Sequence, residues 1–201
     1  MKAFLIAPAL AALTLGACGT LVEEPATEVY EAALEADYRS PQDLENDAAR
    51  MPVETLSFMG IKPGDSVVEL EAGGGYFTAI LAETVGPTGQ VWMQNPAVFD
   101  QFWGGGDHPR METLPGQVIY LRSDFDNLSV VQTETVDVVT WIQGPHELWY
   151  IPEGATEPLG HPDKTFKEIA RVLKPGGSLI VQDHRAPDGL TGINWRRYAP
   201  D

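Results

Sequence analysis

A buried strand that leads directly into a glycine loop is the feature that most constrains the fold of this chain. Residues Ser66–Leu70 are rich in β-branched side chains, which predicts a strand covered on both faces. Gly73, Gly74 and Gly75 follow, and Tyr76–Val85 fits a helix. Because glycines let backbone N–H groups and a helix start approach a ligand closely, this unit predicts a binding site at the loop.

Strands and helices continue to alternate along the rest of the chain. Further strands are predicted at Gln90–Gln94, Val118–Arg122, Thr135–Ile142 and Ser178–Asp183, and helices from Ser40 to about Met51, from Pro52 to Gly60 and from Asp163 to Leu173. Residues 96–116 are irregular, and we expect only a short helix and a mobile loop there. The alternation predicts an α/β fold with a doubly wound, mainly parallel sheet and helices on both faces. Ligands bind such sheets beyond the carboxyl ends of the strands.

The first residues have the pattern of an export signal. Lys2 precedes an apolar stretch, Ala3–Leu15, that is too short to span a bilayer comfortably. Leu15–Cys18 resembles the bacterial lipobox, in which the cysteine becomes the lipid-carrying first residue of the mature protein. We expect residues 1–17 to be a signal peptide, 18–37 a lipidated acidic tether and 38–201 the folded domain. The protein is then exported to the cell envelope (periplasm) and anchored to a membrane through Cys18; the alternative is an ordinary cleaved signal.

Charge and cysteine content narrow the possible functions. The chain has 29 acidic and 13 basic side chains, a formal net charge of -16, which would repel a nucleic-acid phosphate backbone. We therefore expect no nucleic-acid partner. Cys18 is the single cysteine, so no internal disulfide can form, and the spacing of the four histidines matches no compact ligand motif. No metal site is predicted.

From Glu69–Gly75 through Leu173–Gly177, the sequence resembles the class I S-adenosylmethionine-dependent methyltransferases. More narrowly, it is similar to predicted secreted bacterial methyltransferases, which show an analogous Gly-Gly-Gly-Tyr loop. The resemblance implies a Rossmann-like fold with S-adenosylmethionine as the cofactor. It also implies that Gly73 and Gly75 contact the methionine part of the cofactor, with Glu69 near its amino group.

The resemblance suggests roles for residues that follow the later strands. Asn95, or Gln94, stands where the family usually has an acidic residue that holds the ribose hydroxyls. Asp124 would face the adenine amino group and Phe125 the adenine ring, although a solvated carboxylate and a core aromatic are an equal alternative. His146 would face the transferable methyl group and is our catalytic candidate, since a histidine can take a proton near neutral pH; a structural role is the alternative.

Two departures from the family pattern bear on the cofactor site and the sheet. Glu71 replaces the first glycine of the loop, where its side chain would narrow or repolarise the site. Residues 187–201 are too few for the usual C-terminal helix and strand pair, so we expect a sheet without that pair and an edge available to a partner strand.

These observations favour methyl transfer to a small or envelope-associated molecule, mainly by positioning the nucleophile against the sulfonium methyl. A non-catalytic envelope lipoprotein that keeps the fold but has lost the cofactor site is the alternative. A dinucleotide-binding oxidoreductase ranks last, because the acidic residue expected about 20 positions after the glycines is absent.

Overall fold

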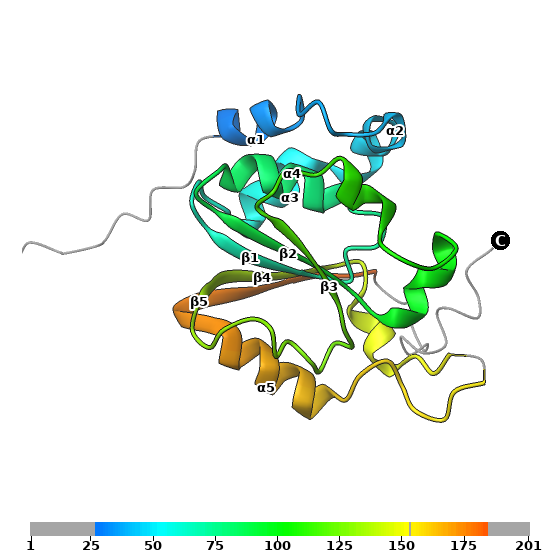
Figure 1. Cartoon of the computed structure of the whole chain (residues 1–201). Helices are drawn as coiled ribbons and strands as arrows, with labels where there is room; N and C mark the ends of the chain where they lie inside the picture. Colours follow the sequence, from blue (N-terminus) through cyan, green and yellow to red (C-terminus); the bar gives the residue numbers. More distant parts are fainter. Residues whose placement is uncertain (1–26, 153, 185–201) are drawn as a thin grey trace, which may run out of the picture.

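Five parallel strands form a sheet in the order β3-β2-β1-β4-β5 (Figure 1) in the computed structural model, which describes residues 27–152 and 154–184. The strands are β1 (Ser66–Leu70), β2 (Gln90–Asn95), β3 (Val118–Arg122), β4 (Val136–Ile142) and β5 (Leu173–Gln182). Val67 of β1 pairs with Val91 of β2 on one side and with Val138 of β4 on the other. The strand order therefore reverses at β1, which places a ligand crevice at its carboxyl end.

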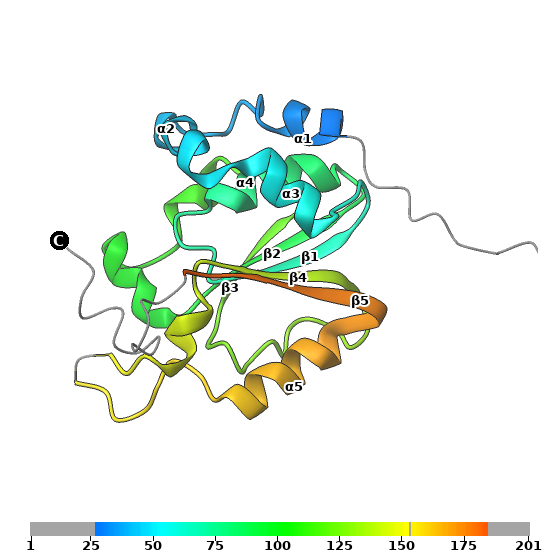
Figure 2. The same ribbon diagram turned by 180° about the vertical axis from the view of Figure 1, so that it is seen from behind.

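Helices cover both faces of the sheet, as predicted (Figures 1 and 2). The α-helices are α1 (Thr27–Ala33), α2 (Pro41–Arg50), α3 (Pro52–Met59), α4 (Tyr76–Val85) and α5 (Pro162–Val172), and the 3-10 helices are η1 (Ala97–Phe102), η2 (Pro109–Glu112) and η3 (Pro145–Trp149). Helices α1, α3 and α4 pack on one face around Leu56 and Ile80, and α5 packs on the other around Trp141 and Ile169. Each face has its own apolar core.

Local sequence explains where α2 and α3 begin and end. Ser40 caps α2, because its hydroxyl accepts a hydrogen bond from the Asp43 N–H while the Asp43 carboxylate accepts one from the Ser40 N–H. Met51 adopts a left-handed conformation between the two helices, and Gly60 ends α3 in the same conformation. Helix α2 is thereby placed beside the carboxyl end of β1.

The N-terminal part of the described chain corrects the predicted tether. Tyr30 and Ala33 of α1 are completely buried, and the Tyr30 hydroxyl donates a hydrogen bond to the Ile61 carbonyl at 2.9 Å. The predicted tether, in which we expect little structure apart from a possible short helix around Val29–Leu34, therefore contains a helix that packs in the core of the domain. The predicted signal peptide and the lipidation site at Cys18 lie outside the described residues. None of the described helices is long and apolar enough to cross a membrane.

Two other elements differ from expectation. The fifth strand begins at Leu173 rather than Ser178, with a register irregularity opposite Val136–Val138 that lets Lys174 pair with Asp137 at 2.8 Å. The β2–β3 connection contains two 3-10 helices, η1 and η2, where one short helix was expected. Their side chains form much of the site.

Candidate functional site

Two adjoining cavities open beside the glycine loop at the carboxyl end of β1. The first, which we call the loop cavity, has a volume of about 480 Å³, and the second, the aromatic cavity, about 680 Å³. They share the lining residues Ser40, Gly73, Gly74, Phe99 and Arg110. Both volumes are typical of small-molecule sites.

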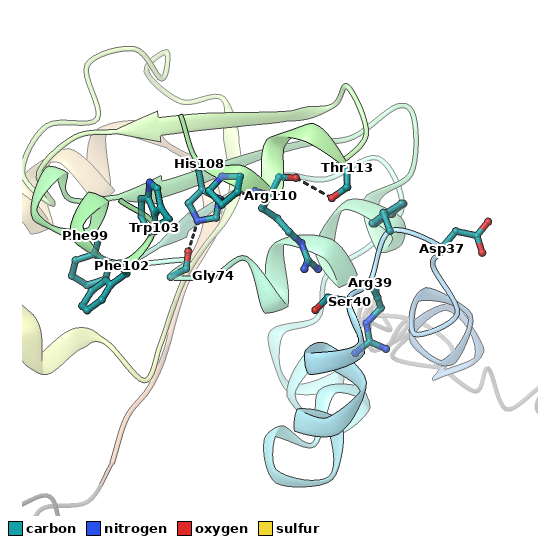
Figure 3. A pocket seen from close by; sticks show the side chains of 13 residues that line it. Asp37, Arg39, Ser40, Gly74, Phe99, Phe102, Trp103, His108, Arg110 and Thr113 are labelled. Atoms are coloured by element: carbon teal, nitrogen blue, oxygen red, sulfur yellow. Dashed lines mark hydrogen bonds between the residues drawn. The ribbon is translucent and has the colours of Figure 1, made fainter. Parts of the chain in front are cut away.

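The aromatic cavity is built largely by the β2–β3 connection. Phe99, Phe102, Trp103 and His108 bring their rings to the side of the cavity near Gly74, while the segment before α2 lines the opposite side (Figure 3). The rings contact one another, with 5.3 Å between the Phe99 and Phe102 centroids and 4.3 Å between those of Trp103 and His108. This lining suits a flat, apolar ligand.

One part of the glycine loop lines the two cavities, and another part packs against neighbouring side chains. A side chain at Gly73 or Gly74 would have no heavy atom within 4 Å of its Cβ, so the loop presents bare backbone to both cavities. Gly75 is buried with φ of 79°, and its Cβ position lies 3.0 Å from Met93 and 3.1 Å from a methylene of Arg110. Gly75 lines neither cavity, and its lack of a side chain allows this close packing; its contact with the cofactor stays a prediction.

Glu69 lies in the wall of the loop cavity, and its place near the amino group of the cofactor stays a prediction. Its side chain is buried and accepts a hydrogen bond from the Thr78 hydroxyl in the first turn of α4. Burial raises the pKa of Glu69 to about 8, while the Thr78 bond and the positive charge of Arg50 act in the opposite direction. The carboxyl group is therefore mainly protonated at neutral pH.

Glu71 has a backbone conformation that favours glycine. Its φ of 54° is left-handed. Gln143 follows β4, lines the loop cavity together with Glu71, and has a φ of 64°. The indole N–H of Trp141 donates a hydrogen bond to the Glu71 carboxylate at 3.0 Å. Strained non-glycine residues of this kind gather at functional sites.

The amides at the end of β2 fasten the glycine loop. The Asn95 side chain accepts a hydrogen bond from Gly73 N at 2.8 Å and donates one to the Gly73 carbonyl at 3.1 Å. Gln94 accepts from Glu71 N and donates to the Ser123 carbonyl. Both amides are completely buried and line neither cavity, and the contact of Asn95 with a ribose stays a prediction.

His108 also holds the glycine loop in place, a role that the sequence alone did not indicate. Its Nε2 lies 3.0 Å from the Gly73 carbonyl, and its Nδ1 accepts a hydrogen bond from Arg110 N at 3.2 Å. The neutral tautomer with the proton on Nε2 satisfies both contacts. Burial lowers the pKa of His108, which favours this neutral form.

Asp124 and Phe125 have the surroundings of a solvated carboxylate and a core aromatic, which is the alternative that their residue types left open. Asp124 is exposed, whereas Phe125 is completely buried with its ring centroid 4.8 Å from that of Trp141. Neither residue lines the loop cavity or the aromatic cavity. The predicted contacts of these two residues with adenine stay predictions.

His146 lies beyond the loop and aromatic cavities. Its Nδ1 is 2.9 Å from an Asp183 carboxylate oxygen at the end of β5, and the same carboxylate accepts a hydrogen bond from His146 N. Its Nε2 lies 3.5 Å from a Glu147 oxygen. The His146–Asp183 contact joins the loops after β4 and β5, and the catalytic role of His146 stays a prediction.

Arg50 is a site residue that sequence reasoning missed. It ends α2, lines the loop cavity and holds its guanidinium 4.7 Å from the centroid of the Tyr76 ring. Tyr76 is fixed in turn by a hydrogen bond from its hydroxyl to Asp47 of α2, at 2.7 Å. The helix could be predicted, but its placement over the cavity depends on tertiary packing.

The described residues contain no group of three or more His, Cys, Asp or Glu side chains arranged to hold a metal ion. The sheet order, the glycine loop and an acidic residue at the end of β1 instead define a Rossmann-like domain of the class I methyltransferase type. Residues 68–181 match the family model described as "Methyltransferase domain". The chain belongs to this family of S-adenosylmethionine-dependent methyltransferases.

Relatives and solved structures agree with this assignment. The chain is 31% identical over 147 residues to the ubiquinone/menaquinone biosynthesis C-methyltransferase UbiE of Hydrogenovibrio crunogenus, covering 69% of this chain and 52% of that protein. Its identity to the protein of the same name in Ectopseudomonas mendocina is 28% over 134 residues, 66% of this chain and 47% of that one. The chain thus spans about half the length of these relatives.

A crystal structure of an S-adenosylmethionine-dependent methyltransferase from Aquifex aeolicus shares the fold. Its TM-score is 0.50 at 21% identity, covering 84% of this chain and 83% of that one. The fold predicted from the alternation of strands and helices is therefore confirmed.

Proposed function

We propose that the protein transfers a methyl group from S-adenosylmethionine to a small apolar acceptor that carries a ring. The observation that carries this proposal is the junction of a charged cavity and an aromatic cavity across the bare backbone of Gly73 and Gly74. A charged cofactor and an apolar acceptor can then meet at one place. Such a junction favours reaction by proximity and orientation.

The loop cavity has the groups that the methionine half of the cofactor requires. That half carries a carboxylate, an ammonium group and a sulfonium. The cavity offers Arg50 to the carboxylate, the Glu71 carboxylate to a cation, and the carboxyl group of Glu69 as a hydrogen-bond acceptor. Gly73 and Gly74 allow close approach to the backbone. The residues present therefore fit this half of the cofactor.

The bound cofactor would supply an already activated methyl group, so the protein's own residues need only bind, orient and exclude water. Asn95 and His108 hold the Gly73 peptide in place through its N–H and carbonyl groups. The rings of the aromatic cavity would pack against one side of the acceptor and keep its nucleophilic atom beside the loop. This division of roles requires no covalent intermediate.

Two observations support an apolar, ring-bearing acceptor. The aromatic cavity is lined by Phe99, Phe102, Trp103 and His108, which offer stacking surfaces rather than charge. In addition, the relatives described above are named for ubiquinone/menaquinone biosynthesis, and quinones are apolar ring compounds. The net charge of -16 further disfavours a nucleic-acid acceptor.

The proposal can be tested by following S-adenosylhomocysteine formation with the full chain and a panel of hydroxylated aromatic compounds. A Phe102→Ala variant should raise KM for the acceptor several-fold, because Phe102 lines the aromatic cavity. Phe58→Ala is the matched control, since Phe58 and Phe102 are both 67% exposed and Phe58 lies on α3 outside both cavities. Turnover that responds equally to both variants, or no turnover by folded protein, would contradict the proposal.

A further inference from the structure

We infer that His108 is a positioning residue for both cavities, because its neutral ring holds the Gly73 peptide beside the cofactor and supports Trp103 beside the acceptor. The inference rests on the proposed function, since it assigns a role to one side chain of the proposed site. His108 would touch neither reacting atom. It would act on the cofactor through the glycine loop and on the acceptor through the wall of the aromatic cavity.

The first step of the argument is that both ring nitrogens of His108 are engaged. Nε2 lies 3.0 Å from the carbonyl of Gly73, which lines both cavities. Nδ1 accepts a hydrogen bond from Arg110 N at 3.2 Å and so caps the 3-10 helix η2. The residue is only 3% exposed, which leaves the ring little room to turn. The ring is therefore held in one orientation between the glycine loop and η2.

The second step is that the His108 ring also packs against other rings. The Trp103 ring centroid lies 4.3 Å from that of His108, and the Tyr120 centroid lies 5.3 Å from it. Trp103 lines the aromatic cavity beside His108 (Figure 3). Its indole N–H is buried and has no hydrogen-bond partner among the described residues, so packing holds the Trp103 ring. Loss of the imidazole would therefore loosen the wall of the aromatic cavity.

The third step is that the two hydrogen bonds of the ring require the neutral form. A proton on Nδ1 would turn this acceptor into a donor that faces the Arg110 N–H. The charged groups near the ring are Arg110 on η2 and Asp100 on η1, and Tyr120 on β3 is the titratable group that packs against it. Burial is the largest cause of a lowered pKa of His108, and Arg110 acts in the same direction, whereas the Gly73 carbonyl and Asp100 oppose it. Acid should therefore release the ring from its orientation.

Two substitutions separate the two hydrogen bonds. His108→Gln extends an amide to about the place of Nε2 and keeps a donor for the Gly73 carbonyl, whereas His108→Asn places an amide near Nδ1 and keeps an acceptor for Arg110 N. In calorimetric titration of the full chain with S-adenosylmethionine at pH 7, His108→Gln should bind about as tightly as the wild type. His108→Asn should bind about fivefold more weakly, because it loses one hydrogen bond to the loop. Both variants should raise KM for the acceptor several-fold, because neither has a ring to pack against Trp103.

The pH profile of cofactor binding is a readout that a purely structural role would not change. The wild type should bind S-adenosylmethionine several-fold more weakly at pH 5 than at pH 7, as His108 gains a proton. His108→Gln has no proton to gain in this range and should lose most of the dependence. His161→Gln is the matched control and should keep the wild-type profile. His161 lies directly before α5, its side chain makes no capping hydrogen bond, and it lines neither cavity.

The outcomes separate this inference from the proposed function. If the wild type binds the cofactor but His108→Asn binds it equally well, or if His108→Gln keeps the wild-type pH profile, the positioning role is overturned while cofactor binding stands. Equal wild-type affinity at pH 5 and pH 7 overturns it as well, and this measurement needs no variant to fold. If folded wild-type protein binds no S-adenosylmethionine at pH 7, the proposed function fails and the inference fails with it.

Discussion

At the scale of single residues, Glu69 shows how burial and function act on one carboxyl group. It is an acidic side chain inside a parallel sheet, where ionisation would leave a buried charge. Its pKa is raised to about 8 from an ordinary value of 4.5, with burial as the largest cause. Between these two values the folded protein binds more protons than the unfolded chain. The stability that this pKa difference contributes to the folded protein is fully present below pH 4.5 and is lost as the pH rises through 8.

A Glu69→Gln variant should therefore become more stable relative to the wild type as the pH is raised from 5 to 8. Glutamine keeps an oxygen that can accept the Thr78 hydrogen bond but cannot ionise. Urea unfolding of both proteins across this pH range measures the difference. The same difference at every pH would show that Glu69 ionises normally in the folded state.

Two residues that the sequence singled out line the loop cavity because of their backbone position. Glu69 and Gly73 reach the cavity because each lies at the end of β1 or directly after it. Asn95 and Phe125 also follow strands, but their side chains turn toward Gly73 and Trp141. A resemblance gives the position along the chain, whereas the direction of a side chain depends on packing partners that are distant in sequence.

At the scale of elements, α1 is attached to the domain by two buried residues rather than by a long apolar face. Tyr30 and Ala33 are its buried residues, and they pack in the same core as Leu56 and Ile80. Because the surrounding residues are mainly acidic, the sequence did not indicate that these two residues are buried. Helix α2 was predicted well from its capping residue and proline, yet its function as the support of Arg50 depends on where it packs.

Tyr30→Ala should lower the free energy of unfolding by about 3–5 kcal/mol, because it removes a fully buried ring and its hydrogen bond to Ile61. Leu44→Ala serves as the control, since Leu44 is 56% exposed on α2. Urea denaturation compares the two. Equal small losses would mean that α1 is only loosely attached.

At the scale of the whole molecule, the reversal of strand order at β1 brings separate segments to one crevice. Segments from α2, the glycine loop, the β2–β3 connection and the end of β4 all line the loop cavity. The alternation of strands and helices predicted the parallel, doubly wound sheet, whereas the strand order comes from the structure. The aromatic cavity could not be predicted from the sequence, because η1 and η2 come from an irregular segment without periodicity.

The central claim is that the glycine loop binds S-adenosylmethionine, and Gly74 allows the most direct test. Gly74 lines both cavities, has open space at its Cβ position and lacks the left-handed φ of Gly73, so Gly74→Leu fills the site without backbone strain. Gly116→Leu is the control, since Gly116 is equally open but lines neither cavity.

Calorimetry with S-adenosylmethionine on the full-length protein is the deciding measurement. We predict micromolar binding, equivalent to about −8 kcal/mol, for the wild type and Gly116→Leu, and a loss of at least about tenfold in affinity for Gly74→Leu. No binding by the folded wild type, or equal affinity in all three proteins, would contradict the claim.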